Sequence, residues 1–184
     1  MLDYIWLLPT LPLLGFLLLI LTAGHLPKRA VAIIGAGSIG VSFLVALIIA
    51  VRFLASGEEY FIKETWAWMA VGGFNAGFNF YLDGLSLVMM LIITGIGFLI
   101  HLYATGYMAD DPNYSRFFSY MNLFVAAMLM LVLGDNLVVL YLGWEGVGLC
   151  SYLLIGFWYT NPENGYAARK AFVVTRVGDT SMAI

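Results

Sequence analysis

The segment between Val31 and Leu54 reads VAIIGAGSIGVSFLVALIIAVRFL and contains one charged residue, Arg52. A helix needs about 20 consecutive apolar residues to cross the ~30 Å hydrocarbon layer of a bilayer. Because a helix also satisfies its own backbone hydrogen-bonding groups, as lipid requires, this segment predicts a transmembrane helix. Similar runs predict four further spans and the start of a sixth. The predicted spans are about Tyr4–Ala23, Val31–Leu54, Leu85–Thr105, Phe117–Leu133, Leu137–Trp158 and Ala171–Ile184, the last of which is cut off by the end of the sequence.

The composition of the whole chain also indicates a membrane protein. Of its 184 residues, 62% are hydrophobic and 10% are charged, whereas a soluble domain carries roughly 25% charged residues. Too few polar groups remain to cover a water-soluble fold, which excludes a soluble globular enzyme. The formal net charge of −3 excludes a basic nucleic-acid-binding protein, and the single cysteine excludes an internal disulfide. We predict an all-α polytopic membrane protein with one transmembrane domain over residues 1–184.

Basic residues predict how the chain is oriented. Five of them fall in or beside every second loop, namely Lys28 and Arg29 in loop 24–30, Arg116 in loop 106–116, and Arg169 and Lys170 in loop 159–170. Cytoplasmic loops of membrane proteins are enriched in Lys and Arg. We therefore predict that these three loops are cytoplasmic and that the N-terminus lies outside a cell (inner) membrane. The first span is not a signal peptide, because it begins with Asp3 rather than with basic residues.

The long outside loop, about Ala55–Tyr81, has a pattern of its own. Hydrophobic residues recur at every second position at Trp66 and Trp68 and again over Phe74–Phe80, with Gly72–Gly73 between the two stretches. Alternation on both sides of a Gly-Gly pair predicts a β-hairpin. Its aromatic side is expected to rest at the membrane surface. The alternative is an irregular loop.

Two acidic residues and one glycine motif have structural interpretations. Asp83 and Asp135 each precede an apolar segment and are predicted to cap the N-terminus of a helix. Gly35-Ala-Gly-Ser-Ile-Gly40 matches a dinucleotide-binding pattern, but that motif requires a preceding strand and a helix in water. Inside an apolar span, these glycines instead predict close approach of neighbouring helices.

Glu145 is the first candidate functional residue, because it lies inside the fifth predicted span. If that helix starts near Asn136, Glu145 lies about 13 Å into the membrane. A charge at that depth costs on the order of 3 kcal/mol and persists only where it faces protein or water. Gly148 leaves room beside it for a water molecule or a second helix. Glu145 either exchanges protons near neutral pH, or stays protonated and hydrogen-bonds a neighbouring helix.

Asp179 is the second candidate and lies in the sixth predicted span, with Arg176 three residues before it. Counted from Ala171, Asp179 is about 12 Å from the cytoplasmic side, so antiparallel helices place it at a depth similar to that of Glu145. Arg176 and Asp179 share a helix face and either neutralise one another or form part of a proton relay. His101 is predicted near the inner end of the third span, where a water-exposed residue at the helix end is the alternative to a functional one.

Redox chemistry has no visible support in the sequence. No paired intramembrane histidines are available for haem or copper, and Cys150 is interpreted as a small packing residue. We therefore expect no cofactor and no metal in this chain.

Four stretches of the sequence carry a resemblance to a known family. They are YLGWEGVGLCSYLLIGFW over Tyr141–Trp158, KAFVVTRVGD over Lys170–Asp179, FYLDGLS over Phe80–Ser86 and YSRFF over Tyr114–Phe118. With them, essentially the whole chain resembles the antiporter-like proton-channel family, and within it the L subunit of bacterial NADH–quinone oxidoreductase, respiratory complex I. The resemblance implies that Glu145 is the key glutamate of the fifth helix and Asp179 the buried acid of the sixth.

The resemblance also implies a function and partners. The expected function is proton translocation coupled to quinone reduction, with NADH, FMN, iron–sulfur clusters and quinone held by partner subunits. Other membrane subunits of complex I, especially a neighbouring antiporter-like subunit, and the lipid bilayer are the expected partners. Family members are about three times longer and carry an essential lysine on their seventh helix. We therefore expect the chain to be an N-terminal part of a longer subunit.

Three alternatives remain open at this point. The first is the related large subunit of Mrp-type sodium/proton antiporters, which transports ions without electron transfer. The second is a membrane scaffold that packs other subunits and conducts nothing. The third is a hydrogenase-linked membrane subunit. The run Gly146–Ser151 beside Glu145 favours the complex I member over the Mrp member.

Overall fold

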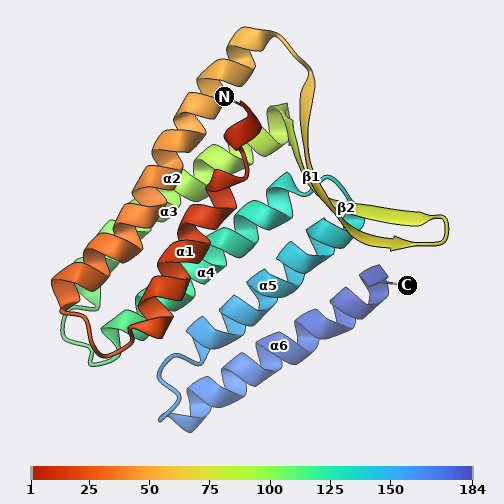
Figure 1. Cartoon of the computed structure of the whole chain (residues 1–184). Helices are drawn as coiled ribbons and strands as arrows, with labels where there is room; N and C mark the ends of the chain where they lie inside the picture. The colour runs from red at the N-terminus through yellow and green to blue at the C-terminus, as the bar shows by residue number, and fades with distance from the viewer. Residues whose placement is uncertain (1, 184) are drawn as a thin grey trace.

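The computed structural model describes residues 2–183 and contains six α-helices and one two-stranded antiparallel sheet (Figure 1). In chain order these are α1 Leu7–Leu21, α2 Lys28–Ser56, β1 Tyr60–Val71, β2 Phe74–Asp83, α3 Gly84–Tyr107, α4 Tyr114–Leu133, α5 Leu137–Ile155 and α6 Pro162–Ala183, and a short 3-10 turn at Leu2–Tyr4 precedes α1. The predicted mostly helical membrane fold with a surface hairpin is confirmed.

Within residues 2–183, five segments are long and apolar enough to cross a membrane. They are Leu2–Leu21 and the whole of α2, α3, α4 and α5. The ends of these five helices differ from the predicted spans by at most three residues. The agreement follows from the bilayer itself, whose thickness sets the length of the apolar run that the sequence shows.

The sixth helix departs from the prediction. α6 begins at Pro162 rather than near Ala171, so most of the predicted loop 159–170 is helical. Proline at the first helical position is pre-organised for a helix, and the Asn161 side chain accepts a hydrogen bond of 3.1 Å from the backbone N–H of Glu163. The polar first turns therefore form a helix that hydropathy does not reveal. α6 is also not among the five segments that meet the length and hydropathy of a span.

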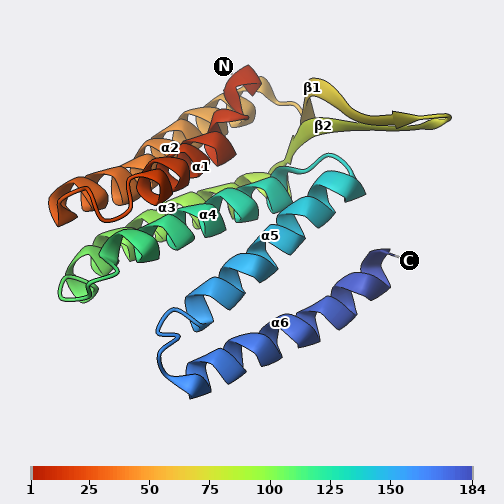
Figure 2. The ribbon, with the colours of Figure 1, turned by 60° about the horizontal axis from the view of Figure 1, so that its bottom comes forward.

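The helices lie side by side with their loops at two ends (Figure 1). α4 is central and packs against α1, α2, α3 and α5, whereas α6 packs against α5 (Figure 2). One end carries the loops 22–27, 108–113 and 156–161. We call it the basic end, because five of the eight lysine and arginine residues lie there: Lys28, Arg29, Arg116, Arg169 and Lys170. The hairpin and the turn between α4 and α5 lie at the opposite end (Figure 1).

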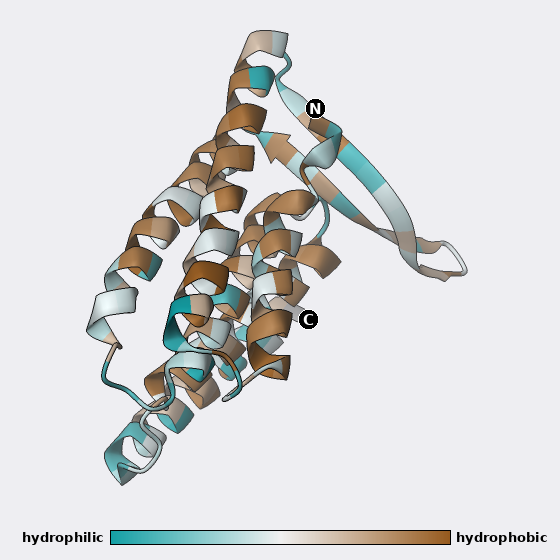
Figure 3. Cartoon of the chain, turned by 60° about the vertical axis from the view of Figure 1, so that its left-hand side comes forward, coloured by the Kyte–Doolittle hydropathy of each residue, from teal (hydrophilic) through white to brown (hydrophobic). Residues whose placement is uncertain are grey.

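Hydrophobic residues dominate the helices, and hydrophilic residues gather near the loops and along parts of the hairpin (Figure 3). Large apolar side chains are exposed along the helices, for example Leu44, Leu99 and Val174. This distribution suits a protein whose outer surface is solvated by lipid rather than by water.

The glycine motif of α2 serves helix packing at two of its three glycines. A Cβ atom on Gly35 would lie 2.6 Å from a ring carbon of Phe118 on α4, and one on Gly40 would lie 2.8 Å from the ring of Phe98 on α3. Gly37 has open space around it. The close approach exposes the Gly35 carbonyl to the side chain of Asn122, which donates a hydrogen bond of 3.2 Å to it.

The hairpin projects from the bundle (Figure 1). Its two-residue turn is Gly72–Gly73, and the positive φ of 59° at Gly72 explains why glycine is needed there. Trp66 stacks on Phe78 across the two strands with ring centroids 4.7 Å apart. The hairpin is tied to the bundle by the Asn136 side chain, which donates a hydrogen bond of 2.7 Å to the Gly77 carbonyl.

One predicted helix cap is observed and one is wrong. Asp83 accepts a hydrogen bond of 2.8 Å from the Ser86 backbone N–H, and the Ser86 hydroxyl lies 2.7 Å from the Asp83 backbone N–H, which completes a capping box. Asp135 does not cap α5. Asn136 is the capping residue, one position further along the chain. The backbone N–H of Asp135 instead donates a hydrogen bond to the Asn79 carbonyl of the hairpin.

Candidate functional site

Glu145, Arg176 and Asp179 lie together where α5 packs against α6. The Arg176 guanidinium contacts the Glu145 carboxylate, and its Nη1 atom also lies 3.7 Å from Oδ2 of Asp179. Arg176 and Asp179 are three residues apart and therefore share one face of α6. We call these three residues the charge cluster. Mutual neutralisation of Arg176 and Asp179 and a proton relay were the two alternatives that the sequence left open; Arg176 lies near both acids.

Trp144 completes the polar contacts of Asp179. Its indole Nε1–H donates a hydrogen bond of 2.7 Å to Oδ1, so each carboxylate oxygen of Asp179 has a positive or donor group nearby. Only 4% of Asp179 is exposed, and a buried charge requires such partners. Trp144 was not among the residues predicted from the sequence. The available signal was an indole inside an apolar span, because an indole N–H in apolar surroundings usually needs an acceptor.

The other two members of the cluster are less enclosed. The side chains of Glu145 and Arg176 are 23% and 32% exposed. Arg176 also lies over the ring of Phe172, 4.4 Å from its centroid, which provides a further favourable contact for the guanidinium. Asp179 is thus fixed inside the contact between the helices, whereas Glu145 and Arg176 can still meet groups from outside this chain.

Two glycines of α5 decide which way Glu145 points. A Cβ atom on Gly143 would lie 2.6 Å from Cα of Leu131, and one on Gly146 would lie 3.0 Å from Cβ of Ala127. Because both glycines lack a side chain, α5 can pack closely against α4 at these positions. Since residues three apart lie on the same face, Glu145 is turned away from this contact and reaches α6 instead.

A cavity of about 190 Å³ lies beside the cluster between α5 and α6. Trp144, Gly148, Ser151, Thr175 and Asp179 are among its lining residues, and a Cβ atom on Gly148 would meet nothing within 4 Å. The volume is ample for several water molecules, each of which occupies about 30 Å³ in the liquid. The sequence predicts room at Gly148 for a water molecule beside Glu145, but the cavity at Gly148 is lined by Asp179 and not by Glu145.

The depth of the cluster follows from the helix bounds. Glu145 lies about 13 Å along α5 from its capping residue Asn136 and about 15 Å from Ile155. Asp179 lies about 26 Å from Pro162 rather than the predicted 12 Å from the helix start, because α6 begins earlier. The two acids nevertheless meet at one level, near the middle of α5.

His101 does not join the cluster. It lies on α3, is fully buried, and its Nδ1 atom is 2.7 Å from the Gly97 carbonyl. Its Nε2 atom has no hydrogen-bond partner within residues 2–183. The alternative of a water-exposed residue at the helix end is wrong, because α3 continues to Tyr107 and the ring packs near Phe118 of α4. Cys150 is buried, as a packing residue would be.

The chemistry of the cluster is that of charge compensation. Two carboxylates and one guanidinium carry a net charge of −1 when all three are ionised, and uptake of one proton makes the cluster neutral. In the part of the chain that the structure describes, no group of three or more His, Cys, Asp and Glu residues is placed to hold a metal ion.

Two family models match this sequence. One is described as NADH-Ubiquinone oxidoreductase (complex I), chain 5 N-terminus, and covers residues 68–118. The other is described as NADH:quinone oxidoreductase/Mrp antiporter, TM, and covers residues 134–184, which include the whole charge cluster. The NADH-quinone oxidoreductase subunit L of Escherichia coli (strain K12) is 59% identical over 173 residues. The chain belongs to this antiporter-like family of complex I membrane subunits.

Further relatives in the family are similar over the same extent. The subunit L of Pseudomonas aeruginosa is 56% identical over 94% of this chain, and that of Mycobacterium tuberculosis (strain H37Rv) is 46% identical over 99%. The match to the E. coli relative covers 94% of this chain but only 28% of that relative. The chain therefore spans less than a third of the length of these relatives.

Solved structures show the same fold. The Mrp complex from Dietzia sp. DQ12-45-1b matches 96% of this chain and 18% of its own chain, with a TM-score of 0.72 and 25% sequence identity. The membrane-bound sulfane sulfur reductase, an archaeal respiratory membrane complex, matches 97% of this chain and 35% of its own, with a TM-score of 0.79 and 17% identity. The second likeness concerns the fold alone.

Proposed function

We propose that this chain forms part of a proton-translocating membrane subunit of an NADH–quinone oxidoreductase complex. The observation that carries the proposal is the charge cluster, in which Arg176 lies between Glu145 and Asp179 at the middle of α5. Ionisable groups at this depth in a membrane protein mark proton or ion pathways by default. Membership of the complex I family supports the same reading.

The proposed mechanism is electrostatic. Arg176 stabilises the ionised forms of both acids, and a further cation near the partly exposed Glu145 stabilises the ionised cluster more strongly. When that cation withdraws, the cluster has an excess negative charge and takes up a proton. The family resemblance implies that this cation is a lysine on a later helix. The cavity at Gly148 and Asp179 provides space for the water that delivers the proton.

Energy for this cycle would come from outside the chain. We propose that quinone reduction in partner subunits drives the movement of the cation, and that NADH, FMN, iron–sulfur clusters and quinone are bound there. Neighbouring membrane subunits, above all another antiporter-like subunit, are the proposed partners. The proposed orientation in the inner membrane places the basic end in the cytoplasm and the N-terminus outside.

Replacement of Glu145 tests the proposal. Glu145→Gln in the full-length subunit, within the assembled complex, keeps the shape of the side chain but removes its charge and its proton exchange. We expect fewer protons translocated per electron pair in proteoliposomes, with the complex still assembled. Glu58→Gln is the matched control, because Glu58 is exposed beside the hairpin. An unchanged proton-to-electron ratio in Glu145→Gln contradicts the mechanism.

A double replacement separates the proposal from a scaffold role. Glu145→Gln combined with Asp179→Asn leaves both side-chain volumes unchanged. A pure scaffold would keep full proton translocation once the complex assembles. We expect the double variant to lose at least as much translocation as Glu145→Gln alone.

The likeness to the Mrp complex favours a second candidate, a sodium/proton antiporter subunit. The two functions differ in what drives the proton. An antiporter in sealed vesicles moves protons in response to a sodium gradient without NADH, whereas the proposed function requires NADH oxidation. Proton flux that depends on sodium alone would therefore favour the antiporter.

A further inference from the structure

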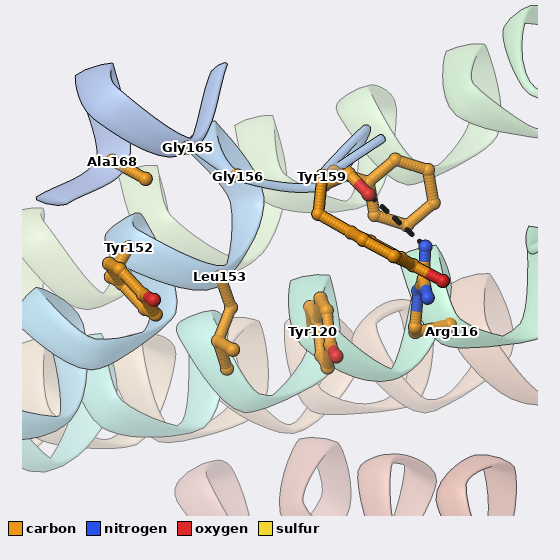
Figure 4. Close-up of a pocket in the computed structure, with 9 residues that line it drawn as sticks. Arg116, Tyr120, Tyr152, Leu153, Gly156, Tyr159, Gly165 and Ala168 are labelled. Atoms are coloured by element: carbon orange, nitrogen blue, oxygen red, sulfur yellow. Dashed lines mark hydrogen bonds between the residues drawn. The ribbon is translucent and has the colours of Figure 1, made fainter. Parts of the chain in front are cut away.

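Arg116 at the basic end is held in an unusual way. It lies in the first turn of α4, and its guanidinium is close to two aromatic rings, 4.8 Å from the centroid of Phe157 and 5.1 Å from that of Tyr159. Its Nη2 atom donates a hydrogen bond of 3.1 Å to the Phe157 carbonyl, drawn as a dashed line in Figure 4. The two rings and the carbonyl limit the rotation of the planar guanidinium and hold it in one position.

The guanidinium is fixed but not neutralised. Its Nε atom is buried and has no hydrogen-bond partner within residues 2–183. Across the same described part of the chain, the carboxylates found within 4.0 Å of a basic side chain pair with Lys63 or Arg176, and Arg116 has none. Arg116 is only partly buried, but its Nε–H lacks an acceptor, and an anionic ligand in contact with the guanidinium would compensate its charge.

The space for such a ligand adjoins Arg116. A cavity of about 210 Å³ lies between α4, the end of α5 and the start of α6. Figure 4 shows Arg116 and Tyr159 on one side of it and Tyr120, Tyr152 and Leu153 along the others. The lining thus includes three tyrosines, Tyr120, Tyr152 and Tyr159. Tyrosine hydroxyls can donate hydrogen bonds to phosphate oxygens.

A second cavity, of about 370 Å³, adjoins Arg116 on the side of α1 and α2. Its lining includes the basic side chain of Lys28 together with the apolar side chains of Ile20, Leu26 and Val31. The surroundings of Arg116 therefore combine positive charge with apolar walls at the end of a helical bundle. A free inorganic anion needs the first feature only, whereas an amphiphile uses both.

We propose that Arg116 binds the phosphate of an anionic phospholipid headgroup. Arginine forms paired hydrogen bonds with phosphate oxygens, and Arg116 lines both cavities. Basic pockets between transmembrane helices are recognised sites for anionic headgroups. The lipid joins α4 to the loop 156–161 and so holds the start of α6 against the bundle.

Lipid titration of the delipidated complex, containing the full-length subunit, tests this site by native mass spectrometry. The probes are phosphatidylglycerol, the neutral phosphatidylcholine and inorganic phosphate. The test variant is Arg116→Gln. The control is Arg169→Gln at the same end, whose guanidinium also lies over a ring, 5.8 Å from the centroid of Tyr166. If the complex with Arg116→Gln fails to assemble, Arg116→Lys serves as the test variant, because it keeps the positive charge but lacks the planar guanidinium.

We expect wild type and Arg169→Gln to retain one phosphatidylglycerol more tightly than Arg116→Gln does, by about tenfold in apparent affinity, or about 1.4 kcal/mol. Arg116→Lys should fall between them. Equal retention by wild type and both Arg116 variants overturns the proposal. Equal binding of phosphatidylcholine overturns the role of the negative charge, and full displacement of the lipid by millimolar inorganic phosphate overturns the assignment to a lipid. None of these readouts depends on proton translocation.

Discussion

The indole nitrogen of Trp144 on α5 donates a hydrogen bond of 2.7 Å to Oδ1 of Asp179 on α6. This bond joins two helices through a residue pair 35 positions apart in the chain. A hydrogen bond to an ionised group contributes about 1.5–3 kcal/mol, more than one between neutral groups. Trp144 is therefore a positioning residue for the acid that faces the cavity between the helices.

Trp144→Phe removes this donor and keeps most of the ring. We expect lower proton translocation by the assembled complex, because the Asp179 carboxylate is then free to rotate away from its place beside Arg176. Trp158→Phe is the matched control. It removes an indole bond of 2.9 Å to Asp111, but at the exposed basic end. Equal translocation in the two variants would contradict the role of Trp144.

Gly143→Ala should destabilise the bundle. The added methyl would lie 2.6 Å from Cα of Leu131, and backbone atoms cannot yield as a flexible side chain does. Overpacking of this kind costs about 1–3 kcal/mol. We expect a lower midpoint of thermal unfolding for Gly143→Ala and an unchanged or higher midpoint for Gly148→Ala, where the methyl meets open space and alanine favours the helix. A lower midpoint for Gly148→Ala than for Gly143→Ala would show that α4 and α5 are not closely packed at Gly143.

Asn122 and Ser38 should prove energetically coupled. The Ser38 hydroxyl donates a hydrogen bond of 2.5 Å to Oδ1 of Asn122 between α2 and α4. Such bonds between membrane helices average about 0.6 kcal/mol. A double-mutant cycle with Asn122→Leu and Ser38→Ala, read by unfolding in mixed micelles, should return a coupling of about that size. Strictly additive effects would mean that the bond contributes nothing to stability.

The cap at Asp83 should respond to acid. The backbone N–H of Ser86 donates to the Asp83 carboxylate and holds its pKa below the ordinary value of 3.8. The ionised cap therefore stabilises the start of α3 above pH 3.8, and this contribution is lost as the pH falls through the lower, folded-state pKa. Hydrogen exchange of the Ser86 amide, corrected for its intrinsic rate, should accelerate in that acidic range. Asp83→Asn keeps a capping oxygen and should remove the pH dependence; a steep acid response in this variant would place its origin elsewhere.

The sequence is informative about the spans because lipid imposes a single requirement, a long apolar run. The same requirement explains the error at α6. Hydropathy locates the residues that lipid surrounds, whereas the helix starts where Pro162 and Asn161 favour its first turn. The cap at Asn136 was missed for a tertiary reason, since the neighbouring Asp135 is occupied by the hairpin.

The charge cluster was predictable only in part. Helical spacing places Arg176 beside Asp179, and depth places Glu145 near the membrane centre. Which acid Arg176 contacts depends on how α5 rotates against α4, and the glycines at 143 and 146 fix that rotation through atoms of another helix. The burial of His101 likewise depends on the position of Phe118 on α4, which periodicity along one helix does not show.

The modest apolarity of α6 bears on how the protein is made. Glu163, Arg169, Lys170, Arg176 and Asp179 all lie on this helix, so it partitions poorly into lipid by itself. Its partner α5 supplies the counter-charge of Glu145 and the indole of Trp144. We expect α5 and α6 to leave the translocon as a preformed pair, with ion-pair formation preceding lateral release into the bilayer.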